Sequence, residues 1–330
     1  MAKTTAKTKS GSLLKILLAA IVICIIPVLM PNMYIMQIVN MICIYIILGT
    51  SINLLTGFTG QLSLGQAAFF GIGAYTAALL NTRLGLQFFP CMIGSVLITA
   101  LFGVILAIPA LKVKGSYLAL LTMGFGEVVR IVMINWTPVT NGTAGILGIE
   151  SPVIFGFPFD TLNKMYFLIM AFVVLGLLYQ NVLIRTRTGR AFVAIREDNE
   201  AAELTGIDVT GYKIRAFVLS SIYCGVAGCL YTMMIRYVSP DTFTSNVSSV
   251  ILWTAIVGGF GTVAGPVLGG IIMQVLPEIL RFLGDWRLVA YGIILLVVIL
   301  RFPGGLYPYL QKLWQRCFQN KAAVDTAGKG

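Results

Sequence analysis

The chain has 330 residues, of which 58% are hydrophobic and only 11% are charged, and it carries a formal net charge of +11. Soluble domains of this size carry far more charge on their surface, so the composition indicates a polytopic membrane protein. The basic residues gather in the N-terminal tail, a central island and the C-terminal tail. This distribution is typical of charge that sets membrane topology beside anionic lipid, and not of a nucleic-acid-binding face.

The residue types that most often perform catalysis and bind metals are scarce. The sequence contains no histidine, which removes the commonest general base and the commonest zinc ligand. The six cysteines form no CxxC motif, lie mostly in apolar segments and are predicted to be small packing residues: Cys24, Cys43, Cys91, Cys224, Cys229 and Cys317. No GxxxxGK[ST] motif is present. We therefore expect no catalytic residue, metal site or nucleotide in this chain.

The N-terminal part predicts two membrane spans. Residues 1–12 are polar and basic, and the apolar run that follows, Leu13–Met30, is long enough to cross a bilayer. A signal peptide starts in a similar way, but no cleavage site of small residues is evident. We predict that the first span leaves the cytoplasm over 13–30 and that the second returns over 33–55.

A glycine-rich segment, Gly57–Leu80, comes next. Its glycines are interleaved with hydroxyl and amide side chains: Thr56, Thr59, Gln61, Ser63 and Gln66. Small residues at such spacing let helices approach closely, and they also permit unwound turns within the membrane. Backbone groups freed by such turns must be buried in protein or line a wet cavity. The segment fits both tight helix packing and a wall of a transport pathway.

The following spans are predicted over 91–111 and 116–135. The second carries Glu127 and Arg130, which lie on one helical face and are able to partner each other. Ionisable residues this close to the membrane usually face the interior of a helix bundle. The pair fits either a pathway role or a structural ion pair near the interface.

The charged island, Arg185–Arg215, lies between spans predicted over 165–184 and 214–237, after an external loop over 135–164. Its middle suits one short amphipathic helix around residues 191–206. A polar helix between two spans cannot lie in hydrocarbon, and its many Arg and Lys residues place it in the cytoplasm. A solvated connector would show a similar charge pattern.

The number of membrane spans in the last part of the chain must bring the basic tail back to the cytoplasm, where its charge belongs. The sequence Gly258-Gly259-Phe260-Gly261 breaks an apolar run near its middle. Two short elements, over 247–258 and 262–280, would enter and return, and a final span over 288–300 would exit inward. This gives about ten membrane segments in a permease domain of residues 13–303, with the basic tail over 304–330 and both termini cytoplasmic.

The two glycine-rich breaks occupy corresponding positions in the two halves, because Gly57-Phe58 and Gly259-Phe260 each open one. Paired interruptions of this kind indicate a substrate site near the middle of the membrane in transporters with internal repeats.

The island also contains the order Glu200-Ala201-Ala202 followed by Gly206, which resembles the EAA loop by which ABC importer permeases dock onto their ATPase subunits. This resemblance implies a coupling role for residues 185–212. The implied coupling residues are Gly189, Arg190, Arg196, Glu197, Glu200, Ala201, Ala202, Glu203 and Gly206.

Four stretches together resemble the LivM-type permease of branched-chain amino acid ABC importers. They are Thr56–Tyr75, Gly115–Ile146, the island, and Gly258–Gly270, and the similarity covers most of residues 33–310. One departure is Thr140-Asn141-Gly142, where Thr-Gly-Gly is expected. Asparagine tolerates a left-handed backbone, so we expect the turn to be kept.

The resemblance implies an all-α polytopic membrane fold, the core of a type II-like importer with short broken or re-entrant helices, in the bacterial inner membrane. It also implies a related second permease subunit, two ABC ATPases that carry ATP and Mg²⁺, and an external amino-acid-binding protein. The implied substrates are leucine, isoleucine and valine, with urea and amide importers as close relatives.

A zwitterionic amino acid with an apolar side chain needs polar partners for its charged ends and an apolar wall for its tail. The candidate pathway residues are Thr56, Thr59, Gln61, Ser63, Gln66, Phe69, Thr122, Phe125, Glu127, Gly259 and Gly261. An ion-coupled secondary transporter is a rival, for which only Glu127 is a serious mid-membrane carboxylate. An intramembrane enzyme is a weaker one, since no span holds paired Asp or Glu.

Overall fold

The computed structural model describes residues 32–113, 115–154, 156–302 and 304–311. The first predicted span over 13–30, the N-terminal tail over 1–12, and Cys24 and Cys317 lie outside these residues. The four other cysteines are buried and free, as predicted.

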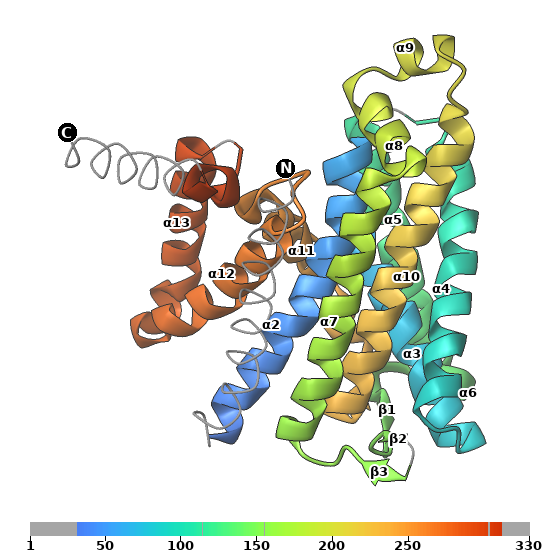
Figure 1. Cartoon of the computed structure of the whole chain (residues 1–330). Helices are drawn as coiled ribbons and strands as arrows, with labels where there is room; N and C mark the ends of the chain where they lie inside the picture. Colours follow the sequence, from blue (N-terminus) through green and yellow to red (C-terminus); the bar gives the residue numbers. More distant parts are fainter. Residues whose placement is uncertain (1–31, 114, 155, 303, 312–330) are drawn as a thin grey trace, which may run out of the picture.

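Helices joined by short turns make up almost all of the described chain (Figure 1). The helices of ten or more residues are α2 (Met33–Ile52), α3 (Gln66–Leu84), α4 (Phe88–Ala110), α5 (Ser116–Asn135), α7 (Leu162–Arg185), α8 (Arg187–Glu197), α10 (Val209–Ile235), α11 (Ser245–Gly258), α12 (Gly265–Ile279) and α13 (Arg287–Arg301). Shorter ones are α6 (Thr137–Thr140), α9 (Asn199–Leu204), the π-helical η1 (Asn53–Phe58), and the 3-10 helices η2 (Gly142–Ala144), η3 (Pro240–Phe243) and η4 (Leu280–Trp286).

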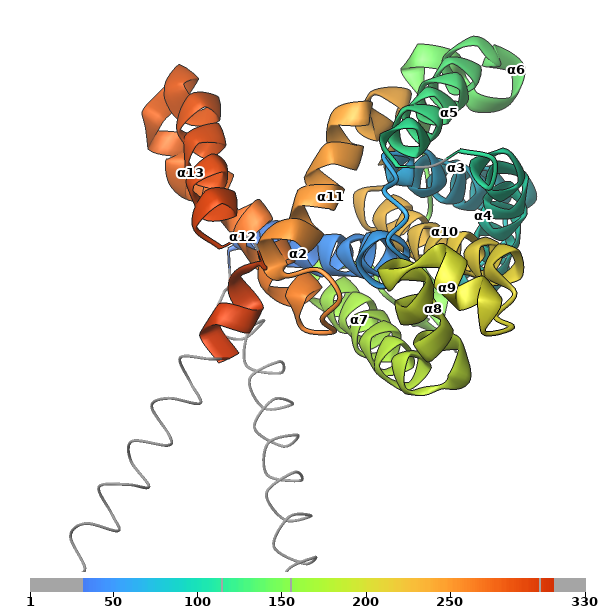
Figure 2. The ribbon, with the colours of Figure 1, turned by 90° about the horizontal axis from the view of Figure 1, so that it is seen from above.

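The long helices run between two ends of the molecule, which we call the α9 end and the β-strand end (Figure 1). α2 starts at the β-strand end and reaches the α9 end, and α3, α4, α5, α7 and α10 then alternate in direction. Seen along the bundle, α2, α3, α4, α7 and α10 group together and α5 lies at one edge (Figure 2). α11 runs from beside α2 towards α5, and α12 and α13 stand beyond α2.

Six helical stretches within the described residues are long and apolar enough to cross a membrane. They are Met33–Phe58, Phe88–Ala110, Ser116–Asn135, Leu162–Arg185, Val209–Ile235 and Gly265–Gly284, and Ser245–Gly258 is a shorter apolar helix. The all-helical membrane fold is therefore confirmed. The count of about ten segments stays a prediction.

The centre of the bundle is formed by α10 against α3 and α4. A Cβ on Gly73 of α3 would come within 2.7 Å of the Cα of Gly225 of α10, and a Cβ on Gly228 within 2.5 Å of the carbonyl oxygen of Phe70. Only glycine lets the two backbones approach so closely. The glycines of α3 thus serve helix packing, one of the two interpretations of this segment.

The break between α11 and α12 confirms that the chain enters and returns there. Gly259 (φ +122°) and Gly261 (φ +71°) form the turn at the α9 end. α12 then leads back to the start of α2, where the hydroxyl of Tyr34 donates to Glu278 and accepts a hydrogen bond from Arg281. α13 returns towards the α9 end (Figure 1).

The β-strand end is closed by two short antiparallel pairs. β1 (Ile146–Leu147) pairs with β4 (Tyr237–Val238), and β2 (Val153–Ile154) pairs with β3 (Phe157–Pro158). Asn141 has a φ of +62°, so the expected left-handed turn at Thr140-Asn141-Gly142 is confirmed.

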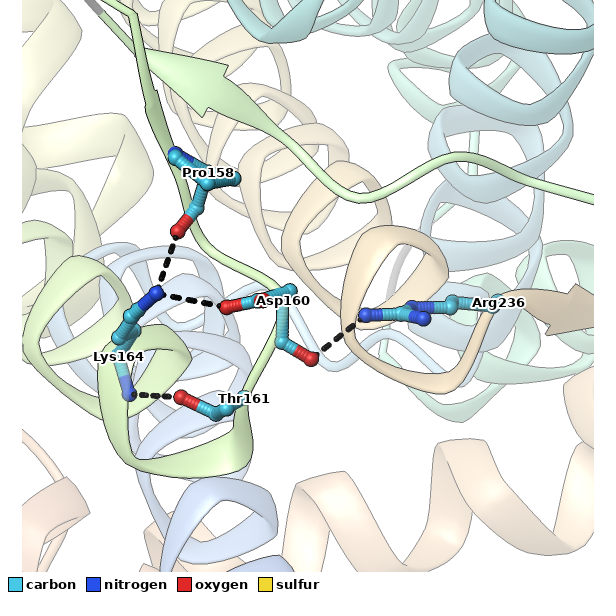
Figure 3. Close-up of polar contacts among 5 residues, drawn as sticks. All are labelled: Pro158, Asp160, Thr161, Lys164 and Arg236. Carbon is cyan, nitrogen blue, oxygen red and sulfur yellow. Dashed lines mark hydrogen bonds and ion pairs between the residues drawn. The ribbon is translucent and has the colours of Figure 1, made fainter.

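A polar cluster ties the start of α7 to the end of α10 (Figure 3). Lys164 Nζ lies 2.7 Å from the Asp160 carboxylate and donates to the carbonyl oxygen of Pro158 at 3.1 Å. Arg236 donates to the carbonyl oxygen of Asp160 at 2.7 Å. The hydrogen bond from Lys164 lowers the pKa of the Asp160 carboxyl below its usual value.

Candidate functional site

Asn53 joins the two glycine-rich segments. This fully buried residue opens η1, its amide donates to the carbonyl oxygen of Thr262 at 2.8 Å, and its Oδ1 accepts from the N–H of Gly261 at 2.9 Å. A Cβ on Gly57 would collide with the Asn53 amide, so glycine is required there. We call Asn53, Gly57, Gly261 and Thr262 the glycine junction.

Arg196 of α8 contacts the glycine junction. Its Nη1 donates to the carbonyl oxygen of Gly57 at 2.6 Å, and a Cβ on Gly261 would come within 2.7 Å of the same nitrogen. One guanidinium group therefore touches both glycine-rich segments. The junction lies at the α9 end of the bundle, because η1 extends α2 to Phe58 and the turn falls after a complete apolar stretch, Met33–Phe58.

A polar cavity of about 150 Å³ opens beside the glycine junction. It is lined by Thr59 and Gln61 from the first glycine-rich segment and by Arg196, Asn199 and Lys213 from the charged island, among others. The cavity thus brings predicted pathway residues next to a predicted coupling residue.

The hydroxyl and amide groups around this turn are largely bonded to one another. Thr56 Oγ1 donates to the carbonyl oxygen of Gln61 at 2.9 Å, and Gln61 Nε2 donates to Thr59 Oγ1 at 3.0 Å. The Thr59 hydroxyl donates to the carbonyl oxygen of Leu55. Ser63 Oγ accepts from the N–H of Gly65 at 3.3 Å. These bonds shape the turn, so these groups are not all free to meet a solute.

Gln66, the first residue of α3, is fully buried where α2, α3 and α10 meet. Its Oε1 accepts from Ser51 Oγ at 3.0 Å, from Ser220 Oγ at 3.3 Å and from Cys224 Sγ at 2.9 Å. Its Nε2 has no hydrogen-bond partner among the described residues. A buried amide nitrogen with spare donors is uncommon and requires an explanation, such as a group that binds transiently.

Thr122 and the two phenylalanines occupy the contact between α3 and α5. Thr122 Oγ1 accepts from the N–H of Leu64 at 2.9 Å and donates to the carbonyl oxygen of Ala119 at 3.0 Å. The rings of Phe69 and Phe125 lie 5.8 Å apart between centroids. Phe125 also lines an apolar groove of about 280 Å³ between α3, α4 and α5.

The ion pair predicted between Glu127 and Arg130 is present but long, at 3.8 Å. Arg130 makes a shorter ion pair, at 2.9 Å, with Asp241 of η3. Asp241 follows β4 closely in the chain, and its ion pair with Arg130 adds a third charge to this part of α5.

The charged island forms two helices and not the single helix expected around residues 191–206. Asp198 has an extended backbone (φ −157°) and ends α8. Its carboxylate accepts from the N–H groups of Glu200 at 2.8 Å and Ala201 at 3.1 Å, so it caps the start of α9. Gly206, with a φ of +83°, follows the end of α9.

Of the nine predicted coupling residues, two are buried and seven are exposed. Gly189 and Ala202 are buried, and α8 packs against α7 and α10 through Ala191, Phe192 and Ile195. The residues that stay exposed at the α9 end are Arg190, Arg196, Glu197, Glu200, Ala201, Glu203 and Gly206. Leu204 beside them is 89% exposed, which leaves an apolar side chain on an otherwise charged tip.

Several residues of these clusters were not predicted from the sequence: Ser51, Asn53, Ser220, Cys224 and Asp241. Asn53 had a signal, since a polar side chain one turn before Gly57 stands out in an apolar span. The serines resemble ordinary small packing residues. Within the described part of the chain, no three His, Cys, Asp or Glu side chains come together as metal ligands would.

The chain matches the family described as "Branched-chain amino acid transport system / permease component" over residues 34–300. The chain belongs to this family. The permease is 35% identical over 315 residues to the high-affinity branched-chain amino acid transport system permease protein LivM of Salmonella typhimurium, with 88% of this chain and 74% of that protein covered.

Two other relatives extend this similarity. The permease is 35% identical over 295 residues to LivM of Escherichia coli, covering 82% of this chain and 69% of that protein. It is 24% identical over 323 residues to a probable LivM of Methanocaldococcus jannaschii, covering 80% of this chain and 90% of that protein. No solved structure matches the chain significantly. The resemblance drawn from the four sequence stretches is therefore confirmed, and the chain is a multi-pass membrane permease of a branched-chain amino acid transport system.

Proposed function

We propose that this permease forms part of the route by which an ATP-driven importer carries leucine, isoleucine and valine across the bacterial inner membrane. The family match over residues 34–300 and the names of the LivM relatives support this substrate class. The complex we propose contains a second, homologous permease subunit, two ABC ATPases and an external amino-acid-binding protein. The α9 end and both termini face the cytoplasm in this arrangement, because the charged island lies at that end.

The contact between Arg196 and Gly57 carries the coupling part of the proposal. The exposed surface of α8 and α9, residues 187–204, receives the ATPase, and nucleotide-driven movement of α8 reaches the glycine junction through the Arg196 guanidinium. The junction links η1 to the turn between α11 and α12, so one movement displaces both glycine-rich segments together. The pathway candidates Thr59, Gln61 and Gln66 lie along this route.

Replacement of Arg196 by alanine tests the coupling. We expect the Arg196→Ala complex, in proteoliposomes with binding protein and ATP, to retain its ATPase subunits and to take up labelled leucine roughly tenfold more slowly, because a charge-assisted hydrogen bond is lost. Arg187→Ala is the matched control, since this exposed arginine lies on the same helix and makes no hydrogen bond or ion pair recorded for the described residues. Equal uptake by the two variants would contradict the coupling route.

A further inference from the structure

Three charged side chains meet on the second half of a candidate membrane span. Glu127 and Arg130 are the twelfth and fifteenth of the twenty residues of α5 (Ser116–Asn135), and η3 brings Asp241 beside them. Their side chains are 39%, 27% and 75% exposed, respectively. We call these three residues the α5 ion cluster.

Little of the surface of α5 is covered by the described residues of this chain. α5 buries only Leu118, Ala119, Thr122 and Met133, so most of its circumference is uncovered in this chain. Exposed charges on a membrane span are costly in hydrocarbon, and intramembrane ionisable residues almost always face a bundle interior or a water-filled cavity. By this rule the α5 ion cluster faces the interior or a water-filled cavity of the assembled transporter.

The charges and hydrogen bonds of the α5 ion cluster are incomplete. Two carboxylates and one guanidinium give a net charge of −1. Arg130 is bonded to Asp241 at 2.9 Å, which leaves Glu127 with a single recorded contact, 3.8 Å from Arg130. Arg130 Nε is buried and has no acceptor among the described residues. The cluster thus holds a carboxylate with one long ion pair and, next to it, a guanidinium N–H that lacks an acceptor.

We propose that Glu127 binds the α-ammonium and Arg130 the α-carboxylate of the amino acid that crosses the membrane. These two groups of an α-amino acid lie on one carbon, which suits an acid and a base that are themselves 3.8 Å apart. Met123 and Ile131 lie one helical turn before and after Glu127 and are 38% and 53% exposed, so they form an apolar strip for the branched side chain. The proposal rests on the proposed function and names the part of the chain that recognises its substrate.

Uptake kinetics of the complete complex in proteoliposomes test this site. Glu127→Gln is isosteric but cannot pair with an ammonium group, so we expect its KM for L-leucine to rise about tenfold or more, with Glu127→Asp recovering part of the loss. Arg130→Lys should raise KM similarly, because lysine keeps the charge and loses the Nε donor. Glu150→Gln, on the outer loop before β2, is the matched control and should leave KM unchanged.

A binding measurement separates recognition from folding or assembly. In the purified complex without the external binding protein, we expect L-leucine to displace labelled leucine far better than 4-methyl-2-oxopentanoate, which lacks the ammonium group, or L-leucinamide, which lacks the carboxylate. Glu127→Gln should remove the preference over the oxo acid, and Arg130→Lys the preference over the amide. Comparison within one variant does not depend on the yield of folded complex.

The outcomes distinguish this proposal from the proposed function. If wild-type complex takes up leucine, and Glu127→Gln and Arg130→Lys keep its KM and its ligand preferences, the zwitterion site is overturned and the proposed function stands. If wild-type complex hydrolyses ATP and imports no branched-chain amino acid, both are overturned.

Discussion

Asp160 shows what one exposed carboxylate does at the β-strand end. Its carboxylate accepts a hydrogen bond from Lys164 and its carbonyl oxygen accepts one from Arg236 (Figure 3). Asp160 therefore connects the start of α7 to the end of α10. Its pKa is lower in the folded chain than its usual value. A lowered pKa means that the ionised carboxylate stabilises the fold above the unfolded-state pKa and loses this effect as the pH falls through the folded-state pKa.

We expect Asp160→Asn to lower the thermal unfolding midpoint of the purified permease at pH 7, because the carboxylate that holds Lys164 is lost. The difference from wild type should shrink as the pH falls below the unfolded-state pKa of about 4, and it should vanish below the lower folded-state pKa, where the wild-type carboxyl is itself protonated. Unfolding scans at several pH values measure it, with Glu150→Gln as the control. A difference that stays constant from pH 7 into the acid range would contradict the assignment.

Single residues were the least predictable part of the site. The side chains of Thr59, Gln61 and Gln66 were identified because polar groups among glycines are conspicuous in a hydrophobic span. Their hydrogen-bond partners were not, since Ser51, Ser220 and Cys224 come from helices far apart in the sequence. Only packing in three dimensions decides which small polar residue meets which.

At the scale of elements, the glycine junction couples η1 to the turn between α11 and α12 through one side chain. Asn53→Asp keeps the acceptor for the N–H of Gly261, removes the donor to Thr262 and sets a carboxylate against a carbonyl oxygen. We expect leucine uptake per ATP hydrolysed to fall roughly tenfold, because one oxygen of a buried carboxylate then faces the carbonyl oxygen of Thr262 with no donor between them.

Asn81 provides a matched control for Asn53. It is also buried, its amide donates to the carbonyl oxygen of Leu86 at 3.0 Å, and its Oδ1 accepts from the N–H of Glu150 at 2.8 Å, at the opposite end of the bundle. Asn81→Asp should reduce stability in a comparable way and leave the ratio of uptake to hydrolysis unchanged. Equal ratios in the two variants would show that the junction has no part in coupling.

The sequence predicted most helices to within a few residues, and α5 at its full extent, because apolar runs with charged or glycine ends define spans well. The division of the charged island into α8 and α9 could not be predicted from the spacing of its apolar residues. Asp198 ends α8 and caps α9, and a capping side chain competes locally with helix continuation. The π-helical continuation of α2 was not predicted either, since it leaves no mark in hydropathy.

At the scale of the whole molecule, the direction of the permease in the membrane is testable with single cysteines. We expect Phe157→Cys, in β3 and 74% exposed in wild type, to react with a membrane-impermeant maleimide in intact cells. Glu200→Cys, in α9, should react only in inverted vesicles, because the basic island belongs in the cytoplasm. The wild-type chain controls for the native cysteines. The opposite labelling pattern would place the α9 end outside and remove the basis for ATPase docking there.

The uncovered surface of α5 has a consequence for a permease copy that is not yet assembled with its partner subunits. A newly inserted copy exposes Glu127 and Asp241 towards the bilayer until another chain screens them. In the proposed complex, the charges that recognise the substrate thus also favour association with the companion subunits, because a covered or hydrated site removes their cost in hydrocarbon.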